Sequence, residues 1–265
     1  NLSERYRFYK ADISERSIIN SILEEAQPDL IIHLAAETHV DKSINSPDNF
    51  ISSNIIGTFE LLKSSLAYFE KVDEDIQKKF KFIHISTDEV FGSLSKKGFF
   101  NENSKYNPRS PYSASKASSD HLVKSWFHTY GLPCIITNCS NNYGPWQNPE
   151  KLIPNTISKA LLNEYIPVYG DGTNIRDWLY VDDHIDAILL AADKGIPGSN
   201  YCIGGNNEKT NIEIVNKICQ YLDKYIPREN SYKSLIKFVK DRPGHDFRYS
   251  LNCKKIRTKL KWRPS

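Results

Sequence analysis

Short apolar runs alternate with longer amphipathic stretches in the first half of the chain, and this alternation constrains the fold more than any other feature. The runs at 30–36, 82–86 and 134–139 are typical of strands, and the alternating stretch at 6–11 is also compatible with one. The run at 30–36 is continuously apolar, which is typical of a strand buried on both faces of a parallel sheet.

Helical periodicity separates these runs. We expect helices over 12–27, closed by Pro28, over 46–69 with apolar residues on one side, and over 110–131, ended by Gly131. The β-α-β-α order predicts an α/β fold of Rossmann type, with a doubly wound parallel sheet. From about residue 145 the chain becomes rich in Gly, Pro, Asp and Arg, with helices expected at about 152–164, 182–194 and 211–225.

Composition excludes several classes of protein. The 265 residues carry 39% hydrophobic and 25% charged side chains, as in ordinary folded domains, and a net charge of +3 argues against a nucleic-acid binder. The apolar runs are too short to cross a membrane. Five cysteines are scattered without metal-ligand spacing, so we predict no metal site and favour reduced thiols in a cytoplasm. Neither a methionine nor a Gly-rich phosphate-binding loop is present, so we expect the sequence to be part of a longer protein.

A polar cluster, Ser86-Thr87-Asp88-Glu89, follows the apolar run at 82–86. Such residues are common in surface turns, and a turn would explain them. In a doubly wound sheet, however, ligands bind beyond the carboxyl ends of the strands, where this cluster is expected. Two adjacent carboxylates could then divide the roles of acid and base. The cluster alone leaves both interpretations open.

Tyr112 and Lys116 are four residues apart and therefore lie on one face of the predicted helix. An ammonium near a phenol favours the phenolate and lowers the pKa of the tyrosine. A tyrosine of this kind can take the proton from a sugar hydroxyl while hydride leaves the same carbon. A bare Tyr-x-x-x-Lys often occurs by chance on exposed helices, but here it begins a helix soon after a strand that ends in Ser-Thr.

Three cations lie in or directly after segments that we expect to be loops: two arginines lie within them, and a lysine follows GPWQNPE. They are Lys151, Arg176 and Arg242. Arginine forks suit bidentate binding of a diphosphate, and lysine adds a point charge. Solvated surface charge is the alternative, and it suits Arg176 least because Gly170, Gly172 and an apolar run surround it.

Taken together, these motifs resemble the extended short-chain dehydrogenase/reductase family, and within it the dTDP-glucose 4,6-dehydratases. The resemblance covers essentially the whole chain. It is carried by DLIIHLAAETHVDKSI, NIIGT, HISTDEVFG, SPYSASKASSD, CSNNYGPWQNPEKLIP, YGDGTNIRDWLYVDDH, YCIGGNNEKTN and DRPGHDFRY. The family implies an NAD-binding domain over 1–144 and mainly sugar-nucleotide binding over 145–265, with some segments returning to the first domain.

The resemblance also implies a mechanism. Tyr112, with Lys116 and Thr87, would assist oxidation of the C4 hydroxyl of the sugar by NAD+. Glu89 would remove the acidified C5 proton, Asp88 would protonate the departing C6 hydroxyl, and hydride would return from NADH to C6. The product would be a 4-keto-6-deoxy sugar nucleotide, dTDP-4-keto-6-deoxyglucose.

Further residues are assigned by similarity alone. Those expected to bind the cofactor are Asp12, Ile13, Leu34, Ala35, Ala36, Thr38, Asn54, Ser86, Tyr112 and Lys116. Those expected to bind the sugar nucleotide are Thr87, Asn141, Lys151, Leu152, Arg176, Asn211, Arg242 and His245. The alanine pair could equally serve close strand-to-helix packing, and His245 could be a surface histidine.

The sequence departs from the family pattern at several points, and other functions are still open. The family's Gly-rich opening and closing helix are absent from the sequence, and Asn138 stands where we expect arginine. A UDP-sugar or GDP-sugar 4,6-dehydratase, a 4-epimerase or a non-enzymatic NAD(H)-binding protein are the alternatives. An epimerase has no use for the Asp-Glu pair, and a binding protein would typically lose Tyr or Lys.

Family resemblance further implies a cytoplasmic homodimer, formed by the helices near 49–69 and 112–130 as a four-helix bundle.

Overall fold

The computed structural model describes residues 6–265 and divides the chain into two compact units. The first unit contains residues 1–86, 110–137 and 191–200, and the second contains 87–109, 138–190 and 201–265. The chain passes from the first unit to the second between Ser86 and Thr87. The units are defined by compactness and not by ligand, so the division of binding roles at residue 144 stays a prediction.

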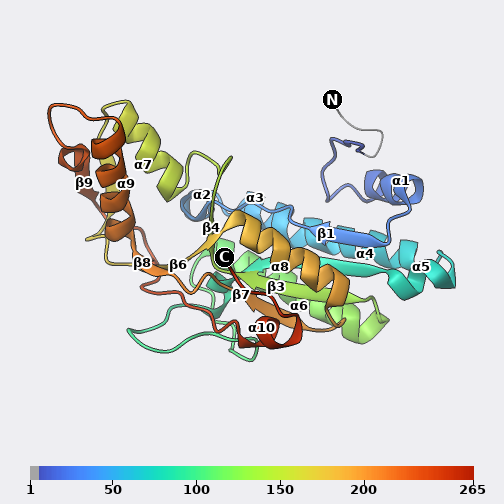
Figure 1. Ribbon diagram of the computed structural model, residues 1–265. Coiled ribbons are helices and arrows are strands. Elements are labelled where there is room, and N and C mark those ends of the chain that lie inside the picture. The colour runs from blue at the N-terminus through green and yellow to red at the C-terminus, as the bar shows by residue number, and fades with distance from the viewer. Residues whose placement is uncertain (1–5) are drawn as a thin grey trace. The chain divides into compact units, whose positions relative to one another are not determined.

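A four-stranded sheet has the order β1-β2-β3-β7; most of β7 belongs to the second unit, and β1 with most of β2 and β3 belongs to the first unit (Figure 1). Its strands are β1 Leu30–His33, β2 Lys81–Thr87, β3 Cys134–Cys139 and β7 Asn200–Ile203. The helices of this unit are α1 Arg16–Ala26, α2 Val40–Asn45, α3 Asp48–Phe50, α4 Thr58–Phe69, α5 Glu74–Lys79 and α6 Pro111–Tyr130. Strands β1 and β2 are parallel, with Leu30 opposite Lys81. Helices alternate with strands of a parallel sheet, so the predicted Rossmann-type α/β fold is confirmed.

One hydrophobic core joins the helices to this sheet. Leu62 of α4, Phe82 of β2 and Val123 of α6 are fully buried in it, and Leu23 of α1 is nearly so. Helix α4 packs against both α1 and α6. Complete burial of a large aliphatic or aromatic side chain contributes about 1.5–3 kcal/mol, so this core fixes the position of α6 against β2.

Of the two strands predicted near the start of the chain, the one over 6–11 was wrong and the one over 30–36 was confirmed in part. Residues 6–11 form no strand, and Tyr6 and Phe8 are 53% and 71% exposed, because no neighbouring strand pairs with them in the described part of the chain. The apolar run at 30–36 forms only the four-residue β1, in which three residues are half-buried. Strand β1 has one neighbour in the described sheet, and an edge position leaves a strand less covered than a central one.

The long helix predicted over 46–69 is interrupted. Between α3 and α4, residues Ile51–Gly57 form a π-helix, with the wider turn that often marks functional sites. The wider turn shifts the buried face, so that Asn54 and Gly57 are buried while Ile55 is only half-buried. A Cβ on Gly57 would lie 2.7 Å from the Ile13 side chain, so a larger residue here would require that side chain to move.

The second unit is built on smaller sheets. Strands β4 Asn141–Tyr143, β6 Ile175–Tyr180 and β8 Glu208–Thr210 form one sheet in the order β4-β6-β8, and β5 Ile166–Tyr169 pairs with β9 Ile236–Val239. Its helices are α7 Leu152–Leu161, α9 Asn211–Tyr225 and α10 Lys254–Lys259, while α8 Val181–Lys194 begins in this unit and ends in the first. Helices α7 and α9 share a core with β5 and β9, and Figure 1 shows these elements together. The three helices predicted after residue 145 are confirmed as α7, α8 and α9.

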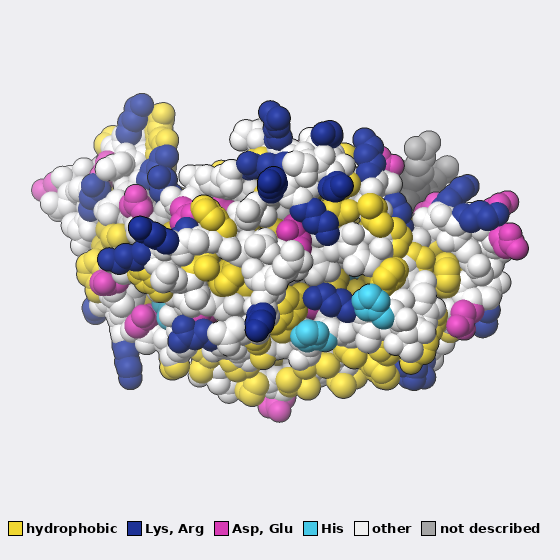
Figure 2. Space-filling view, turned by 90° about the horizontal axis from the view of Figure 1, so that it is seen from below, with side chains coloured by type: hydrophobic (Ala, Val, Ile, Leu, Met, Phe, Trp, Pro, Cys, Tyr) yellow, Lys and Arg dark blue, Asp and Glu magenta, His cyan; other side chains and the backbone are white. Residues whose placement is uncertain are grey.

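Basic side chains are dispersed on the face that Figure 2 shows, where they lie among polar and hydrophobic ones and form no single stripe. Within residues 6–265, no helix combines the length and hydropathy needed to cross a membrane. The same residues contain no group of three or more His, Cys, Asp or Glu placed to hold a metal ion.

Candidate active site

The predicted tyrosine and lysine lie at the beginning of α6, close to its N-terminus. The hydroxyl of Ser110 accepts a hydrogen bond from the Ser113 N–H at 3.1 Å, and the Ser113 hydroxyl accepts one from the Ser110 N–H at 3.0 Å. This capping box fixes where the helix starts and therefore where Tyr112 lies in its first turn. Tyr112 and Lys116 are 8% and 4% exposed, so both are far more buried than a chance pair on a surface helix.

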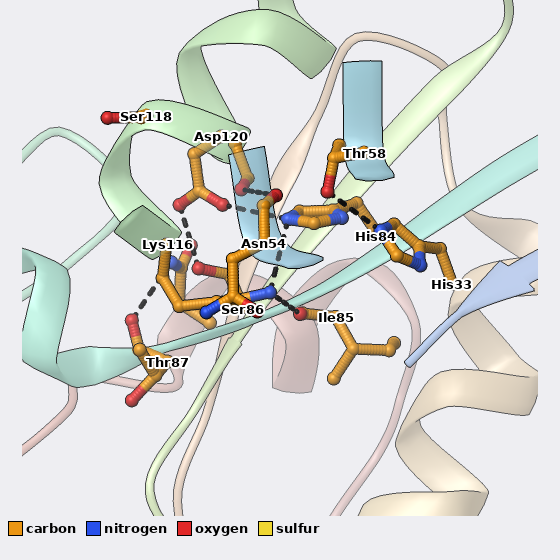
Figure 3. A network of polar contacts seen from close by, with 12 residues as sticks. His33, Asn54, Thr58, His84, Ile85, Ser86, Thr87, Lys116, Ser118 and Asp120 are labelled. Carbon is orange, nitrogen blue, oxygen red and sulfur yellow. Dashed lines mark hydrogen bonds and ion pairs between the residues drawn. The ribbon is translucent and has the colours of Figure 1, made fainter. Parts of the chain in front are cut away.

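Lys116 is held by the neighbouring strand. Its ammonium nitrogen donates a hydrogen bond to the carbonyl of Ile85 at 2.8 Å (Figure 3). That carbonyl belongs to β2, so the lysine is fixed between two elements of the same core. An ammonium buried in this way is a strong local source of positive potential for the tyrosine one turn away.

Asn54 links the π-helix to α6. Its amide nitrogen donates to the carbonyl of Glu37 at 3.0 Å and to the hydroxyl of Ser115 at 2.8 Å, while its oxygen accepts from the Glu37 N–H at 2.8 Å. The carbonyl of Asn54 accepts from the Ser119 hydroxyl at 2.6 Å. Asn54 therefore ties the segment that follows β1 to the helix that carries Tyr112 and Lys116.

The residues expected around the cofactor do not share one environment. Leu34 is 60% exposed directly after β1, and Ala35 and Thr38 are also exposed, while Ser86 is buried at the end of β2. The Asp12 carboxylate accepts hydrogen bonds from the N–H and hydroxyl of Ser14, which lower its pKa. The remaining two, Ile13 and Ala36, are partly buried, and Ile13 packs against the core of the first unit.

The two carboxylates lie in the second unit, in a 3₁₀ turn over Asp88–Phe91 that directly follows β2. Thr87 begins this turn, because its hydroxyl accepts a hydrogen bond from the Glu89 N–H at 3.3 Å. The turn is therefore real, and it is also buried, with Asp88 only 2% exposed. A surface turn alone would not bury a carboxyl group, since burying an unpaired charge is costly.

Asp88 is placed to be a neutral acid. Oδ1 is 3.3 Å from the Thr87 hydroxyl, whereas Oδ2 is buried and has no hydrogen-bond partner within the described residues. Burial raises the pKa of Asp88 well above its ordinary value, and the negative charges of Glu89 and Asp177 raise it further. The carboxyl is thus biased toward its protonated form.

Glu89, unlike Asp88, is influenced mainly by positively charged side chains besides its burial. Burial raises the pKa of Glu89, but Arg242, Arg176 and Lys151 act in the opposite direction. On balance the pKa of Glu89 is raised by burial, but less than that of Asp88, because three positive charges oppose the effect of burial. Two carboxyl groups whose environments push their pKa values apart are the usual arrangement for an acid and a base.

The expectation that Arg176 lies in a loop was wrong, because Arg176 lies in β6 and is 4% exposed. Residues 176–179 of this strand are all buried, and β6 pairs with β4 on one side and β8 on the other. Its guanidinium donates to the carbonyls of Ile175 at 2.8 Å and Asp246 at 3.1 Å, and it lies 4.4 Å from the centre of the Tyr249 ring. These contacts fix the cation in a buried position.

Arg242 and His245 lie in the loop after β9, together with Asp241. The Asp241 carboxylate accepts from the Arg242 N–H at 2.8 Å and lies 2.6 Å from Nδ1 of His245. The His245 side chain is only 4% exposed, so it is not a surface histidine. Burial and Arg242 lower the pKa of His245 to about 4, which keeps the imidazole neutral.

The other predicted substrate residues are spread over the second unit. Lys151 caps the N-terminus of α7, and Leu152 begins that helix and packs against its core. Asn141 begins β4, and its buried side-chain oxygen has no hydrogen-bond partner within the described residues. Asn211 begins α9, and its N–H donates to the carbonyl of Asn174 at 3.0 Å.

Sequence reasoning missed several buried ionisable groups. In the second unit these are Asp177, Asp246 and Tyr249; in the first they are His33, His84 and Asp120. Asp177 and Asp246 lie beside predicted residues in the sequence, so a polar residue next to a motif was the available signal. Asn138, which replaces the arginine that we expected, is fully buried and donates to the carbonyl of Thr87 at 3.2 Å.

A Rossmann-type sheet, a buried Tyr-x-x-x-Lys pair and two adjacent carboxyl groups that follow β2 are the features of an extended short-chain dehydrogenase/reductase of the dehydratase type. The family model described as GDP-mannose 4,6 dehydratase matches residues 1–265, and the chain belongs to this family.

Curated relatives agree with this assignment. The chain is 53% identical over 258 residues to a probable dTDP-glucose 4,6-dehydratase of Sinorhizobium fredii, covering 97% of this chain and 74% of that protein. It is also 53% identical over 265 residues to the dTDP-glucose 4,6-dehydratase of Haemophilus influenzae, covering 98% and 78%. Among solved structures, DesIV of Streptomyces venezuelae, a dTDP-glucose 4,6-dehydratase crystallised with NAD and TYD bound, is 40% identical with a TM-score of 0.90, covering 99% and 76%.

Proposed function

We propose that this protein catalyses the NAD-dependent dehydration of dTDP-glucose to dTDP-4-keto-6-deoxyglucose. The observation that carries the proposal is the pair of adjacent carboxyl groups, Asp88 biased toward the acid and Glu89 flanked by three cations. Elimination of water across C5 and C6 requires a base and an acid at adjacent carbons. Curated dTDP-glucose 4,6-dehydratases at 50–53% identity support the choice of reaction and nucleotide.

Tyr112 is the base for the C4 hydroxyl in this proposal. The Lys116 ammonium favours the phenolate, and the strand carbonyl that holds the ammonium keeps it in place. Thr87 adds a hydroxyl that can bind the same sugar oxygen. Oxidation at C4 makes the C5 proton acidic, which prepares the elimination.

Asp88 and Glu89 perform the elimination. Glu89 removes the C5 proton, and Asp88 delivers its proton to the C6 hydroxyl, which leaves as water. The carbonyl of Thr87 is held by Asn138, and its hydroxyl begins the turn, so both carboxyl groups are carried on a fixed segment. Ionised Asp88 and protonated Glu89 would both be inactive, which limits the step to an intermediate range of pH.

The cofactor is NAD, and the described residues fit it. Exposed apolar residues, Leu34 and Ala35, follow the carboxyl end of β1, where a doubly wound fold binds its dinucleotide. Asp12, Ile13, Ala36, Thr38, Asn54 and Ser86 complete the proposed set. Bound NAD supplies hydride acceptance at C4 and hydride return at C6.

Lys151, Arg176, Arg242 and His245 are the proposed ligands of the sugar nucleotide, with Asn141, Leu152 and Asn211. The cations complement a diphosphate, and they also lower the pKa of Glu89. Residues 145–265 are therefore the proposed sugar-nucleotide region and residues 1–144 the proposed NAD region.

We further propose that the protein is a homodimer in the cytoplasm, where NAD and nucleotide sugars are available. The segments at 49–69 and 112–130 present exposed apolar side chains, namely Ile51, Ile56 and Tyr130. Pairing these segments with those of a second copy would cover them in a four-helix bundle. The molar mass in solution tests this assembly.

The test of the function uses the full-length protein with dTDP-glucose and, separately, UDP-glucose and GDP-mannose in D2O. The expected product has lost one water and carries one solvent deuterium at C5, with dTDP-glucose converted fastest. Unchanged mass with inverted C4 would mean an epimerase. No change in any sugar nucleotide would overturn the proposal in favour of an NAD(H)-binding protein.

A further inference from the structure

A buried polar network lies beneath Lys116 in the first unit, and the proposed mechanism leaves most of it without a role. It consists of His33, His84, Lys116 and Asp120, of which His84 and Asp120 are fully buried (Figure 3). Four ionisable groups in one core are costly unless they compensate one another, so their arrangement requires a physical reason.

His84 lies between the lysine and the aspartate. Its Nε2 is 3.5 Å from the Lys116 ammonium nitrogen and 3.3 Å from Oδ1 of Asp120. The second oxygen of Asp120 accepts a hydrogen bond from the Ser86 hydroxyl at 2.9 Å. Figure 3 shows these side chains directed toward one another from β2 and α6. A single ring nitrogen, Nε2, therefore contacts both the ammonium and the carboxylate, and in a neutral imidazole it hydrogen-bonds with one of them at a time.

Regular spacing produces this arrangement. Lys116 and Asp120 are four residues apart and so share one face of α6, while His84 and Ser86 are two residues apart and share one face of β2. The two faces meet, so that His84 contacts both members of the α6 pair. Because each element is regular and packed into the core, the network is rigid.

Asp120 is the acidic member of this network. Burial lowers the pKa of His84 to about 4, and the Lys116 charge lowers it further, while Asp120 acts in the opposite direction. Burial, His84 and Lys116 likewise lower the pKa of His33 well below its ordinary value. Both imidazoles are therefore neutral near pH 7. Burial lowers the pKa of Lys124, one turn beyond Asp120, and the charge of Asp120 opposes that shift.

We propose that His84 and Asp120 are positioning residues for Lys116. Asp120 is its buried counter-charge, and His84 is the spacer that aligns the two. The carboxylate keeps the ammonium protonated at the pH where Tyr112 must lose its proton, and the imidazole prevents the lysine from turning directly toward Asp120 and away from the tyrosine. This inference rests on the role of Lys116 in the proposed function.

The first test is Asp120→Asn, which keeps the shape of the side chain and removes its charge. Lysines labelled with 13C at Cε are titrated in the full-length protein without sugar nucleotide, and Lys116→Met assigns the signal. Loss of an opposite charge at short range moves such a midpoint by about one pH unit or more. We expect the protonation midpoint of Lys116 to fall by that amount and the alkaline limb of the pH–rate profile to follow it. Asp193→Asn, the same change at an exposed position of α8, should move neither.

A second pair of variants covers the case in which Asp120→Asn does not fold. His84→Gln supplies one donor and one acceptor, so it can contact Lys116 and Asp120 together and should retain the profile. His84→Leu removes both contacts and should shift it. The refuting result is a Lys116 midpoint and an alkaline limb that both stay within about 0.3 pH unit of those of the unmodified protein. If His84→Leu and any folded Asp120 variant both give this result, the network is only structural and the proposal is overturned.

The two proposals fail separately. The lysine titration requires no substrate, so a shifted midpoint in a protein that does not dehydrate dTDP-glucose would refute the function and leave the positioning role intact. An active dehydratase with an unshifted midpoint would refute the positioning role alone.

Discussion

Replacing Asp88 by asparagine separates the two halves of the proposed elimination. Asparagine has the shape of the neutral acid, can still bond the Thr87 hydroxyl and leaves no cavity in a site that is 2% exposed. It cannot transfer a proton, however. Substrate binding should therefore change little, whereas the departure of the C6 hydroxyl should be impaired.

The structure sets the size of the effect. A positioned general acid contributes about 10²–10⁴-fold, equivalent to about 2.7–5.4 kcal/mol in the barrier. Oδ2 of Asp88 is the carboxyl oxygen with no other partner within the described residues, so the proton it holds is not shared with a competing acceptor. An amide N–H can still stabilise the leaving oxygen, which favours the lower half of this range.

The assay compares water loss with exchange at C5. In D2O, Asp88→Asn should slow formation of dehydrated product by about 10²–10³-fold. Recovered substrate should nevertheless gain deuterium at C5, because Glu89 is intact and removal of the proton becomes reversible. Asp186→Asn, the same change at an exposed position of α8, serves as control. Water loss reduced by less than about tenfold, or loss of C5 exchange in parallel, would refute the assignment of Asp88 as the acid.

Three further predictions concern pH and stability. Arg176→Met removes a charge that lowers the pKa of Glu89, so the acid limb of the pH–rate profile should move to higher pH. Initial rates between pH 5 and 9 would show this shift, and an unmoved limb would contradict the electrostatic role of Arg176. The folded-state pKa values of His84 and His184 are both lowered to about 4, so the stability that they contribute is present above about pH 6.5 and lost as pH falls toward 4. Urea unfolding across that window should show the decline, and His84→Gln should make it shallower; an identical slope would contradict the assignment. Asn54→Ala leaves buried partners unsatisfied and should lower the free energy of unfolding by about 1–3 kcal/mol, measured against Asn103→Ala at an exposed position.

Most of the fold could be predicted from the sequence because the hydrophobic periodicity of the sequence agrees with the burial seen in most helices and strands. Helix α6 begins at a serine cap, ends at Gly131 in the left-handed conformation with φ 72°, and has the length expected from its pattern. Strands β2 and β3 are central and buried, so their apolar runs were unambiguous. The failures at 6–11 and in β1 have one cause, since periodicity records how apolar a segment is and not how many neighbours it pairs with.

Site prediction from sequence was uneven for a related reason. Tyr112 and Lys116 could be linked because helical spacing fixes their shared face, and Asp88 and Glu89 because they follow a strand. The bias of the two carboxyl groups depends on Arg176, Arg242 and Lys151, which are distant in the chain. The network of His84 and Asp120 is likewise formed only when β2 and α6 pack together.

The π-helix at Ile51–Gly57 has a consequence for variation in length. A π-helical turn contains about one residue more than an α-helical turn, so removing one residue within this segment and restoring regular α-helix would keep the flanking helices nearly in phase and mainly redirect the side chains of the segment itself. Such a deletion would preserve composition, hydrophobic content and helical length almost unchanged. It would nonetheless turn Asn54 away from Ser115 and detach the segment after β1 from α6. The direction of the Asn54 side chain therefore limits how far this helix can be shortened. A homologue that lacks the extra residue would need a different link between the segment after β1 and α6.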